Sequence, residues 1–161
     1  MARHKENRID VVNVRLVKEP SIYAADLIKT PEDVLSAVAN ELKQYDREVF
    51  AIINLKTSGQ IINLNICSVG TLNSSLISPR EVFKSAILSN AAAFIAIHNH
   101  PSGNCHPSEE DKTTTERLMK CGEILDIRML DHIIVAGETG EMLSMKKEGM
   151  MPDHHAREWE R

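Results

Sequence analysis

The chain has 161 residues, of which 42% are hydrophobic and 26% are charged, and its formal net charge is −4. This length and composition are typical of one ordinary globular domain. No apolar run approaches the roughly 20 residues that a membrane-spanning helix needs, and residues 1–6 lack the apolar core of a signal peptide, so we expect neither membrane insertion nor secretion. The acidic balance, with no basic run longer than Lys146-Lys147, gives direct nucleic-acid binding no support.

Cysteine usage indicates the redox compartment. Cys67, Cys105 and Cys121 are odd in number and far apart in the sequence. Disulfide frameworks occur in oxidising compartments and use cysteines in pairs. We therefore expect free thiols and a cytoplasmic protein.

The chain begins with a predicted strand and helix. A valine-rich stretch from Ile9 to Lys18 predicts a strand that ends before Pro20. Thr30 and Pro31 then predict a helix start, because threonine caps helices and proline fits their first turn. The apolar stripe expected to face the core consists of Val34, Leu35, Val38, Leu42 and Tyr45.

A hairpin and a second helix follow. Residues 49–55 are apolar except for Asn54, and residues 61–68 return after a Thr-Ser-Gly turn, which predicts two paired strands. Residues 70–77 mix turn and extended types and are left undivided. Ser78 and Glu81 predict a helix start with a capping box, in which the acid turns back to its own helix terminus. The buried face expected for this helix consists of Val82, Phe83, Ala86 and Ile87.

The second half of the chain continues the alternation. The apolar run 91–97 predicts a buried strand that ends at His98, and a helix is expected from Glu109. Residues 127–135 and 141–145 predict two further strands around a glycine-rich turn. The residues of the helix expected to face inward are Leu118, Cys121, Ile124 and Leu125, with Gly122 interrupting the pattern.

Strands and helices alternate, but the hairpin requires antiparallel pairing. We therefore predict an α/β domain in which a central mixed sheet is sandwiched between helices. We find no internal repeat and no low-complexity block.

Side chains that can bind a metal cluster where the apolar strand ends. Side chains two apart in a strand point the same way, so His98 and His100 can offer their imidazoles to one point. Proline and glycine residues within 101–107 force a loop, and Asp111 follows in the first turn of the next helix. Two imidazoles and a carboxylate can hold zinc and leave a fourth position for water, as catalytic zinc requires.

The same residues also fit a site without metal. Ser108 and Asp111 have the spacing of a capping box, with an aspartate in place of the more usual glutamate or glutamine. Two histidines at a strand end can be solvated or hydrogen-bonded to their neighbours. Spacing alone leaves both alternatives open.

Several motifs resemble a known family. His98-x-His100-Pro101, followed after six residues by Ser108-x-x-Asp111, resembles the signature of the JAMM metalloproteases, the catalytic members of the JAB/MPN domain family. The stretches that resemble the RadC branch of that family are His98–Gly103, Asp131–Ile134, Gly70–Ser75 and Ser78–Lys84. The resemblance extends from Thr30 to Ser144 and covers most of the chain.

The resemblance implies a cytidine-deaminase-like fold with three layers and a zinc-dependent hydrolase of peptide or isopeptide bonds. It implies that Zn²⁺ is bound by His98, His100 and Asp111. It further implies that Ser108 stabilises the developing oxyanion and that Glu48 is the acid/base. The substrate is expected to be a peptide or protein, whose identity has no readable code in the sequence.

Glu81 is the rival of Glu48 for the acid/base role, because it lies in a Pro-Arg-Glu motif that resembles the RadC branch. A capping-box acid is occupied at its own helix terminus. Glu48 opens the first hairpin strand, where the JAMM-like pattern has its glutamate. We therefore predict that Glu48, and not Glu81, lies beside the open zinc position.

Other candidate side chains receive supporting roles or none. Cys105 and His106 lie in the variable spacer of the motif and are not counted as ligands. Asp131 and His132 are interpreted either as a pair that supports a ligand, since an aspartate near zinc commonly accepts a hydrogen bond from a ligand imidazole, or as a structural pair. His154-His155, near the C-terminus, is interpreted as solvated.

We divide the chain into an N-terminal extension with a strand (1–29), a RadC-like JAB/MPN domain (30–145) and a charged C-terminal tail (146–161). Two functions compete with hydrolysis: a DNA-repair or recombination accessory role, implied by the RadC resemblance, and a metal-free interaction module. The helix-hairpin-helix region usual in RadC-like chains has no match in the first 30 residues, which disfavours DNA binding. The filled ligand positions disfavour the metal-free module, and an oligomer remains compatible with the sequence.

Overall fold

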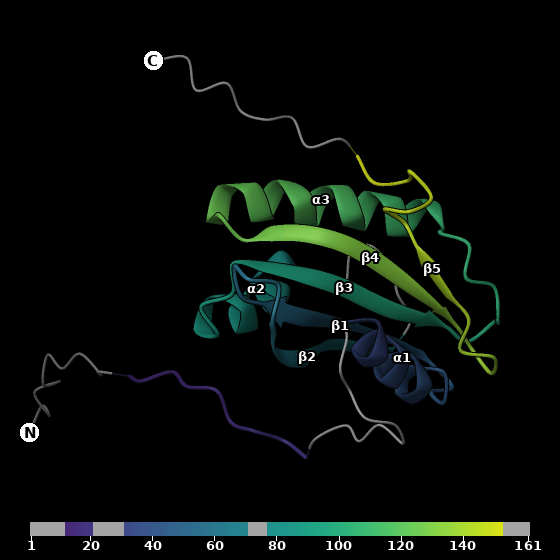
Figure 1. Ribbon diagram of the computed structural model, residues 1–161, viewed down its shortest axis with the longest axis horizontal. Helices are drawn as coiled ribbons and strands as arrows, with labels where there is room; N and C mark the ends of the chain where they lie inside the picture. Colours follow the sequence, from purple (N-terminus) through teal and green to yellow (C-terminus); the bar gives the residue numbers. More distant parts are fainter. Residues whose placement is uncertain (1–11, 21–30, 71–76, 153–161) are drawn as a thin grey trace, which may run out of the picture.

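The computed structural model describes residues 12–20, 31–70 and 77–152 (Figure 1). None of the helices in these ranges is long and apolar enough to span a membrane. The elements are α1 (Pro31–Leu42), β1 (Glu48–Leu55), β2 (Ile61–Gly70), α2 (Pro79–Leu88), β3 (Ala93–His100), α3 (Glu109–Leu125), β4 (Arg128–Ala136) and β5 (Met142–Ser144). All three predicted helices are present, and so are the strands predicted from residue 49 onward.

The strands form one mixed sheet in the order β2-β1-β3-β4-β5 (Figure 1). β1 pairs antiparallel with both β2 and β3, β3 is parallel to β4, and β5 is antiparallel to β4. A parallel pair needs a crossover connection, and α3 provides it between β3 and β4. The predicted α/β class with a central mixed sheet is therefore confirmed.

Helices pack on both faces of the sheet. The α1 face buries Val49, Ala51 and Ile53 of β1, whereas the face that packs against α2 and α3 buries Phe50 and Ile52. Successive side chains of a strand point to opposite faces, which explains the alternation. Because both faces are covered, residues 49–53 of β1 are all apolar and do not alternate with polar residues.

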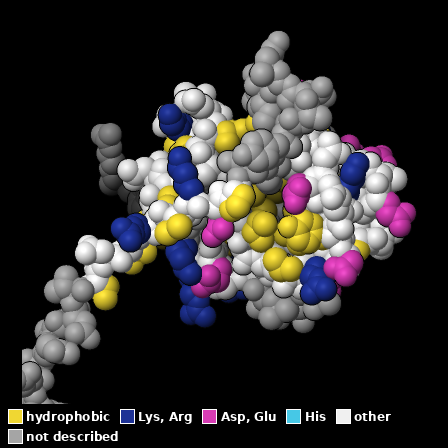
Figure 2. All heavy atoms as spheres, turned by 90° about the horizontal axis from the view of Figure 1, so that it is seen from below, with side chains coloured by type: hydrophobic (Ala, Val, Ile, Leu, Met, Phe, Trp, Pro, Cys, Tyr) yellow, Lys and Arg dark blue, Asp and Glu magenta, His cyan; other side chains and the backbone are white. Residues whose placement is uncertain are grey.

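The predicted strand from Ile9 to Lys18 is wrong for its described part, since residues 12–20 form neither helix nor strand. Val12 and Val17 are 77% and 76% exposed. This segment extends away from the domain on the side of β2, the edge strand of the sheet (Figure 1). Hydrophobic side chains gather on the face of the molecule seen from this side (Figure 2). Strand propensity measures how well a side chain packs against neighbouring strands, and this segment has none. Residues 9–11 lie outside the described residues.

Three apolar side chains predicted to face the core are exposed instead. Ile87 is 53% exposed, Ile124 72% and Leu125 42%. All three lie near the C-terminal end of α2 or α3. The apolar stripe of each helix is thus wider than the surface that the sheet covers, so periodicity alone overestimated burial at the helix ends.

Gly122 interrupts the apolar pattern of α3, but the helix continues to Leu125. A Cβ atom added at Gly122 would lie 2.4 Å from the carbonyl oxygen of Ile127, just before β4. The Ile127 N–H also donates a hydrogen bond of 2.9 Å to the Gly122 carbonyl. The glycine therefore permits a close approach between α3 and the chain that enters β4.

We predict that Gly122→Ala destabilises the fold by about 1–3 kcal/mol, because the added methyl group overpacks a backbone contact. Helix propensity alone would act the other way and favour alanine by about 1 kcal/mol. Urea unfolding measures the sign. Ile124→Ala, at an exposed position of the same helix, should change stability by no more than about 0.5 kcal/mol. A higher urea midpoint for Gly122→Ala would contradict the steric argument.

Candidate functional site

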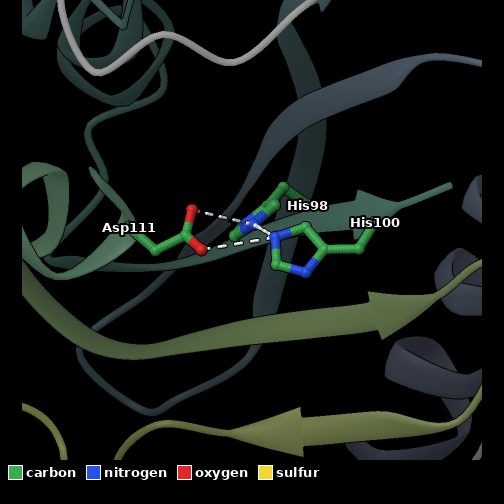
Figure 3. Close-up of side chains that lie close together, drawn as sticks. All are labelled: His98, His100 and Asp111. Atoms are coloured by element: carbon green, nitrogen blue, oxygen red, sulfur yellow. Dashed lines mark hydrogen bonds and ion pairs between the residues drawn. The ribbon is translucent and has the colours of Figure 1, made fainter. Parts of the chain in front are cut away.

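Three side chains converge where β3 ends and α3 begins (Figure 3). His98 and His100 occupy alternate positions at the end of β3, and Asp111 lies in the first turn of α3. His98 Nε2 lies 2.9 Å from His100 Nε2 and 3.1 Å from Asp111 Oδ1, and His100 Nε2 lies 3.3 Å from Asp111 Oδ2. One ligand atom from each residue lies within 4.8 Å of the other two. The structure thus brings together the three side chains that the spacing predicted to converge.

The electrostatics of this group favour an ionised Asp111. Burial alone would raise the pKa of the carboxyl group, but its interactions with the His100 and His98 imidazoles hold that pKa well below its usual value. The interaction with Asp111 raises the pKa of His100 against the opposing effect of burial, and the negative charge of Glu48 adds to the rise. The group therefore consists of a carboxylate and two imidazoles that face it.

Asp111 also belongs to a capping box at the start of α3. Its Oδ2 accepts hydrogen bonds from the Ser108 N–H at 2.7 Å and from the Ser108 hydroxyl at 2.8 Å. The Ser108 hydroxyl in turn accepts from the Asp111 N–H at 3.1 Å. The capping box and the convergence with the histidines occur together, so the two alternatives left open by the spacing do not exclude each other.

The outer nitrogens of both imidazoles are held by hydrogen bonds. His100 Nδ1 lies 2.7 Å from the backbone oxygen of Asn104. A carbonyl oxygen can only accept, so the hydrogen of a neutral His100 is on Nδ1 and its Nε2 is bare. His98 Nδ1 lies 2.8 Å from Nε2 of His132, whose Nδ1 lies 2.6 Å from the Thr115 hydroxyl oxygen. Burial and the adjacent His98 lower the pKa of His132 well below its usual value, so this imidazole is neutral.

Glu48 and Ser108 both lie close to this end of β3. Glu48 is the first residue of β1, and Phe50, two residues further on, pairs with His98. Continuing the antiparallel register places Glu48 opposite His100, in agreement with its effect on the pKa of that imidazole. Ser108 is exposed at the N-cap of α3, with its hydroxyl bonded to Asp111.

Asn99 links the start of β1 to the histidines and was not singled out from the sequence. It is fully buried between His98 and His100 in β3. Its Oδ1 accepts from the Val49 N–H at 2.7 Å, and its Nδ2 donates to the Arg47 carbonyl at 3.0 Å. Because these two backbone groups flank Glu48, Asn99 fixes the main chain that carries this glutamate. The sequence signal that could have identified Asn99 is its position between two histidines at the end of an apolar strand, since a polar side chain buried there needs hydrogen-bond partners.

Glu81 has a different environment from the one expected. The N-cap Ser78 of α2 makes no side-chain capping hydrogen bond, so the predicted capping box is wrong. The exposed Glu81 carboxylate instead accepts a hydrogen bond of 2.8 Å from Lys84, one turn along the same helix. The ion pair with Lys84 replaces the turn back to the helix terminus.

Cys105 and His106 are not part of the metal-binding group found among the described residues. Cys105 lines a cavity of about 340 Å³ between α1 and β5, together with residues such as Leu35 and Met142. His154-His155 lies outside the described residues. The three cysteines are free thiols, as expected.

Of the two alternatives left open for Asp131, the structural one holds, since Asp131 does not accept a hydrogen bond from a ligand imidazole. Its Oδ1 accepts from the backbone N–H groups of His132 at 2.7 Å and Lys146 at 3.0 Å. Its Oδ2 accepts from the Ser144 hydroxyl at 2.5 Å. Asp131 therefore ties β4 to β5, while His132 is the residue that contacts a ligand.

Gly137 supports the loop that follows His100. Its N–H donates to the His100 carbonyl at 2.8 Å, and the Gly103 N–H donates to the same oxygen at 3.0 Å. A Cβ atom added at Gly137 would lie 2.9 Å from the Pro101 oxygen and 3.0 Å from the His100 oxygen. The turn between β4 and β5 therefore approaches the backbone of the histidine strand too closely for a side chain.

Comparison with known proteins gives one consistent result. A model of the RadC-like JAB domain matches residues 28–150. A UPF0758 protein of Desulforamulus reducens is 45% identical over 125 residues, which are 78% of this chain and 54% of the relative. A UPF0758 protein of Bacillus pumilus is 38% identical over 125 residues, which are 78% of this chain and 55% of the relative.

The chain spans about half the length of these relatives. The matched region includes all elements from α1 to β5 and the whole His98–Asp111 segment. The family match thus agrees with the mixed sheet and with the position of the histidine–aspartate group. The chain belongs to the family of RadC-like JAB domains.

Proposed function

We propose that this domain is a zinc-dependent hydrolase of peptide or isopeptide bonds, with Zn²⁺ held by His98, His100 and Asp111. The observation that carries the proposal is the convergence of two imidazole nitrogens and a carboxylate at the end of β3 (Figure 3). Membership of the JAB domain family supports the hydrolytic class.

The residues present fit a divalent cation. His100 Nε2 is bare because Nδ1 donates to Asn104, and the Asp111 carboxylate is ionised. Two imidazole nitrogens only 2.9 Å apart repel each other if both are bare, unless a cation lies between them and the carboxylate. Two nitrogens and one oxygen form a common donor set of catalytic zinc. When bound, zinc would supply Lewis acidity, which polarises a carbonyl group and lowers the pKa of water.

Glu48 is the proposed acid/base. A general base must lie within hydrogen-bonding reach of the proton that it accepts, directly or through one water. The register of β1 against β3 and the effect of Glu48 on the pKa of His100 both support a position near the metal-binding group. Asn99 would maintain this position by binding the backbone on both sides of Glu48.

Ser108 is the proposed donor to the oxyanion that develops when water attacks the carbonyl. Its hydroxyl now donates to Asp111 Oδ2, and rotation about one bond would redirect the hydrogen toward a substrate oxygen. The Ser108 N–H would keep its own bond of 2.7 Å to Asp111. The carboxylate thus remains held while the hydroxyl changes partner. The exposure of Ser108 is compatible with a substrate as large as a peptide or protein.

We predict one zinc ion per chain, and its loss in His98→Ala and Asp111→Ala, because each variant removes one of three protein donors. Elemental analysis of purified protein measures the occupancy. The matched control is His106→Ala, which removes a histidine from the same loop but outside the group. Full occupancy in either ligand variant would remove that residue from the proposed site.

We predict that Glu48→Gln retains zinc but lowers hydrolysis by about a hundredfold or more, since an amide cannot accept the proton. A peptide-library screen with zinc-loaded wild-type protein first identifies a cleaved peptide, whose turnover is then measured. Glu81→Gln, which removes an acid paired with Lys84, should retain the wild-type rate. A library left intact by the zinc-loaded wild type would argue against hydrolysis. An unchanged rate in Glu48→Gln would argue against this base.

We also propose that the chain does not bind DNA tightly, because its formal net charge is −4. Phosphate contacts by lysine and arginine provide most of the affinity in sequence-independent DNA binding. Fluorescence anisotropy with duplex DNA at physiological salt should give a dissociation constant no tighter than about 1 μM. Nanomolar affinity would revive the DNA-repair accessory role.

A further inference from the structure

A buried row of side chains lies behind His98, on the side away from Asp111 Oδ1. We propose that His132 and Thr115 are positioning residues that keep a hydrogen on Nδ1 of His98, so that its Nε2 is available as a bare metal ligand. The proposal rests on the metal site of the proposed function but not on hydrolysis, and it assigns roles to one residue of β4 and one of α3.

The contacts form an unbroken path between two proposed ligands. His98 Nδ1 lies 2.8 Å from His132 Nε2, and His132 Nδ1 lies 2.6 Å from Thr115 Oγ1. Thr115 Oγ1 donates at 2.7 Å to the backbone oxygen of Asp111. His98, His132 and Thr115 are each 0% exposed. The path therefore starts at one ligand and ends on the main chain of another.

The direction of the hydrogen bonds follows from the donor inventory. A hydroxyl group has a single hydrogen, and a carbonyl oxygen can only accept, so the 2.7 Å contact between Thr115 Oγ1 and the Asp111 oxygen requires that hydrogen. Thr115 can then only accept from His132, so the His132 hydrogen is on Nδ1. The bare Nε2 of His132 accepts from Nδ1 of His98. His98 Nε2 is left without a hydrogen and faces His100 and Asp111.

The opposite direction would be incompatible with metal binding. If Thr115 donated to His132, the hydrogens of both His132 and His98 would shift to Nε2. His98 Nε2 would then carry a hydrogen toward Asp111 Oδ1, 3.1 Å away. A protonated nitrogen cannot bind a metal, so the Thr115 bond to the Asp111 carbonyl selects the binding-competent tautomer.

Phe50 helps to isolate the path. Its ring stacks on His98 with centroids 6.1 Å apart and meets His132 edge-on at 5.6 Å. Groups enclosed in this way have no bulk water to supply an alternative hydrogen-bond partner. The orientation of His98 therefore depends on His132 and Thr115.

The first test compares two threonines of α3. Thr115→Val and Thr113→Val both remove a hydroxyl that donates to the carbonyl four residues earlier, but the exposed Thr113 has no imidazole partner. Competition with a chromophoric chelator measures zinc affinity. We expect Thr115→Val to bind zinc about 10–100-fold more weakly, with Thr113→Val unchanged and Thr115→Ser restored to the wild-type value. A loss below tenfold in Thr115→Val, or an equal loss in Thr113→Val, would overturn the proposal.

The second test uses the wild-type chain and needs no variant to fold. In ¹⁵N-histidine NMR spectra of the zinc-loaded protein, His132 and His98 should each carry hydrogen on Nδ1. Hydrogen on Nε2 of His132 would overturn the proposal. If the wild type bound no zinc, the metal site itself would fail; normal zinc binding with the wrong His132 tautomer would reject the positioning role alone.

Discussion

The carboxylate of Asp111 holds the loop, the helix and the histidines in one arrangement. Oδ2 accepts two hydrogen bonds from Ser108 at the start of α3, while Oδ1 and Oδ2 face His98 and His100. Burial of an unpaired carboxylate would be costly, and these partners offset that cost. The start of α3 is therefore fixed at the point where the histidine strand ends.

The sheet places the remaining groups around this carboxylate. Antiparallel pairing of β1 with β3 brings Phe50 opposite His98, and the parallel pairing of β3 with β4 brings His132 behind it. Beyond the last pair of β1 and β3, Phe50 with His98, the Asn99 side chain continues the connection by binding the backbone beside Glu48. Each group near the proposed metal position thus depends on strand pairing between distant parts of the chain.

The sequence was sufficient to predict features that depend on local geometry. The grouping of His98, His100 and Asp111 follows from the two-residue period of a strand, a loop forced by proline and glycine, and a helix cap. The roles of His132 and Thr115 depend on the register of β3 against β4, which no local pattern encodes. For the same reason, the sequence could not decide whether Asp131 or His132 contacts a ligand.

The errors also have physical causes. Valine alternation predicted a strand before Pro20, but the described residues there lack a neighbouring strand. Glu81 has capping-box spacing, yet Lys84 competes for the carboxylate. In both cases the local sequence favoured the predicted structure, but the interaction partner in the fold decided the outcome: a neighbouring strand was missing in the first case, and Lys84 was present in the second.

Gly137 lies directly against the loop that carries the proposed site from β3 to α3. Its backbone lies against Pro101 and binds the His100 carbonyl, so the turn between β4 and β5 is joined directly to the loop after β3. A side chain introduced at position 137 would therefore disturb both the hairpin at this edge of the sheet and the loop of the proposed site.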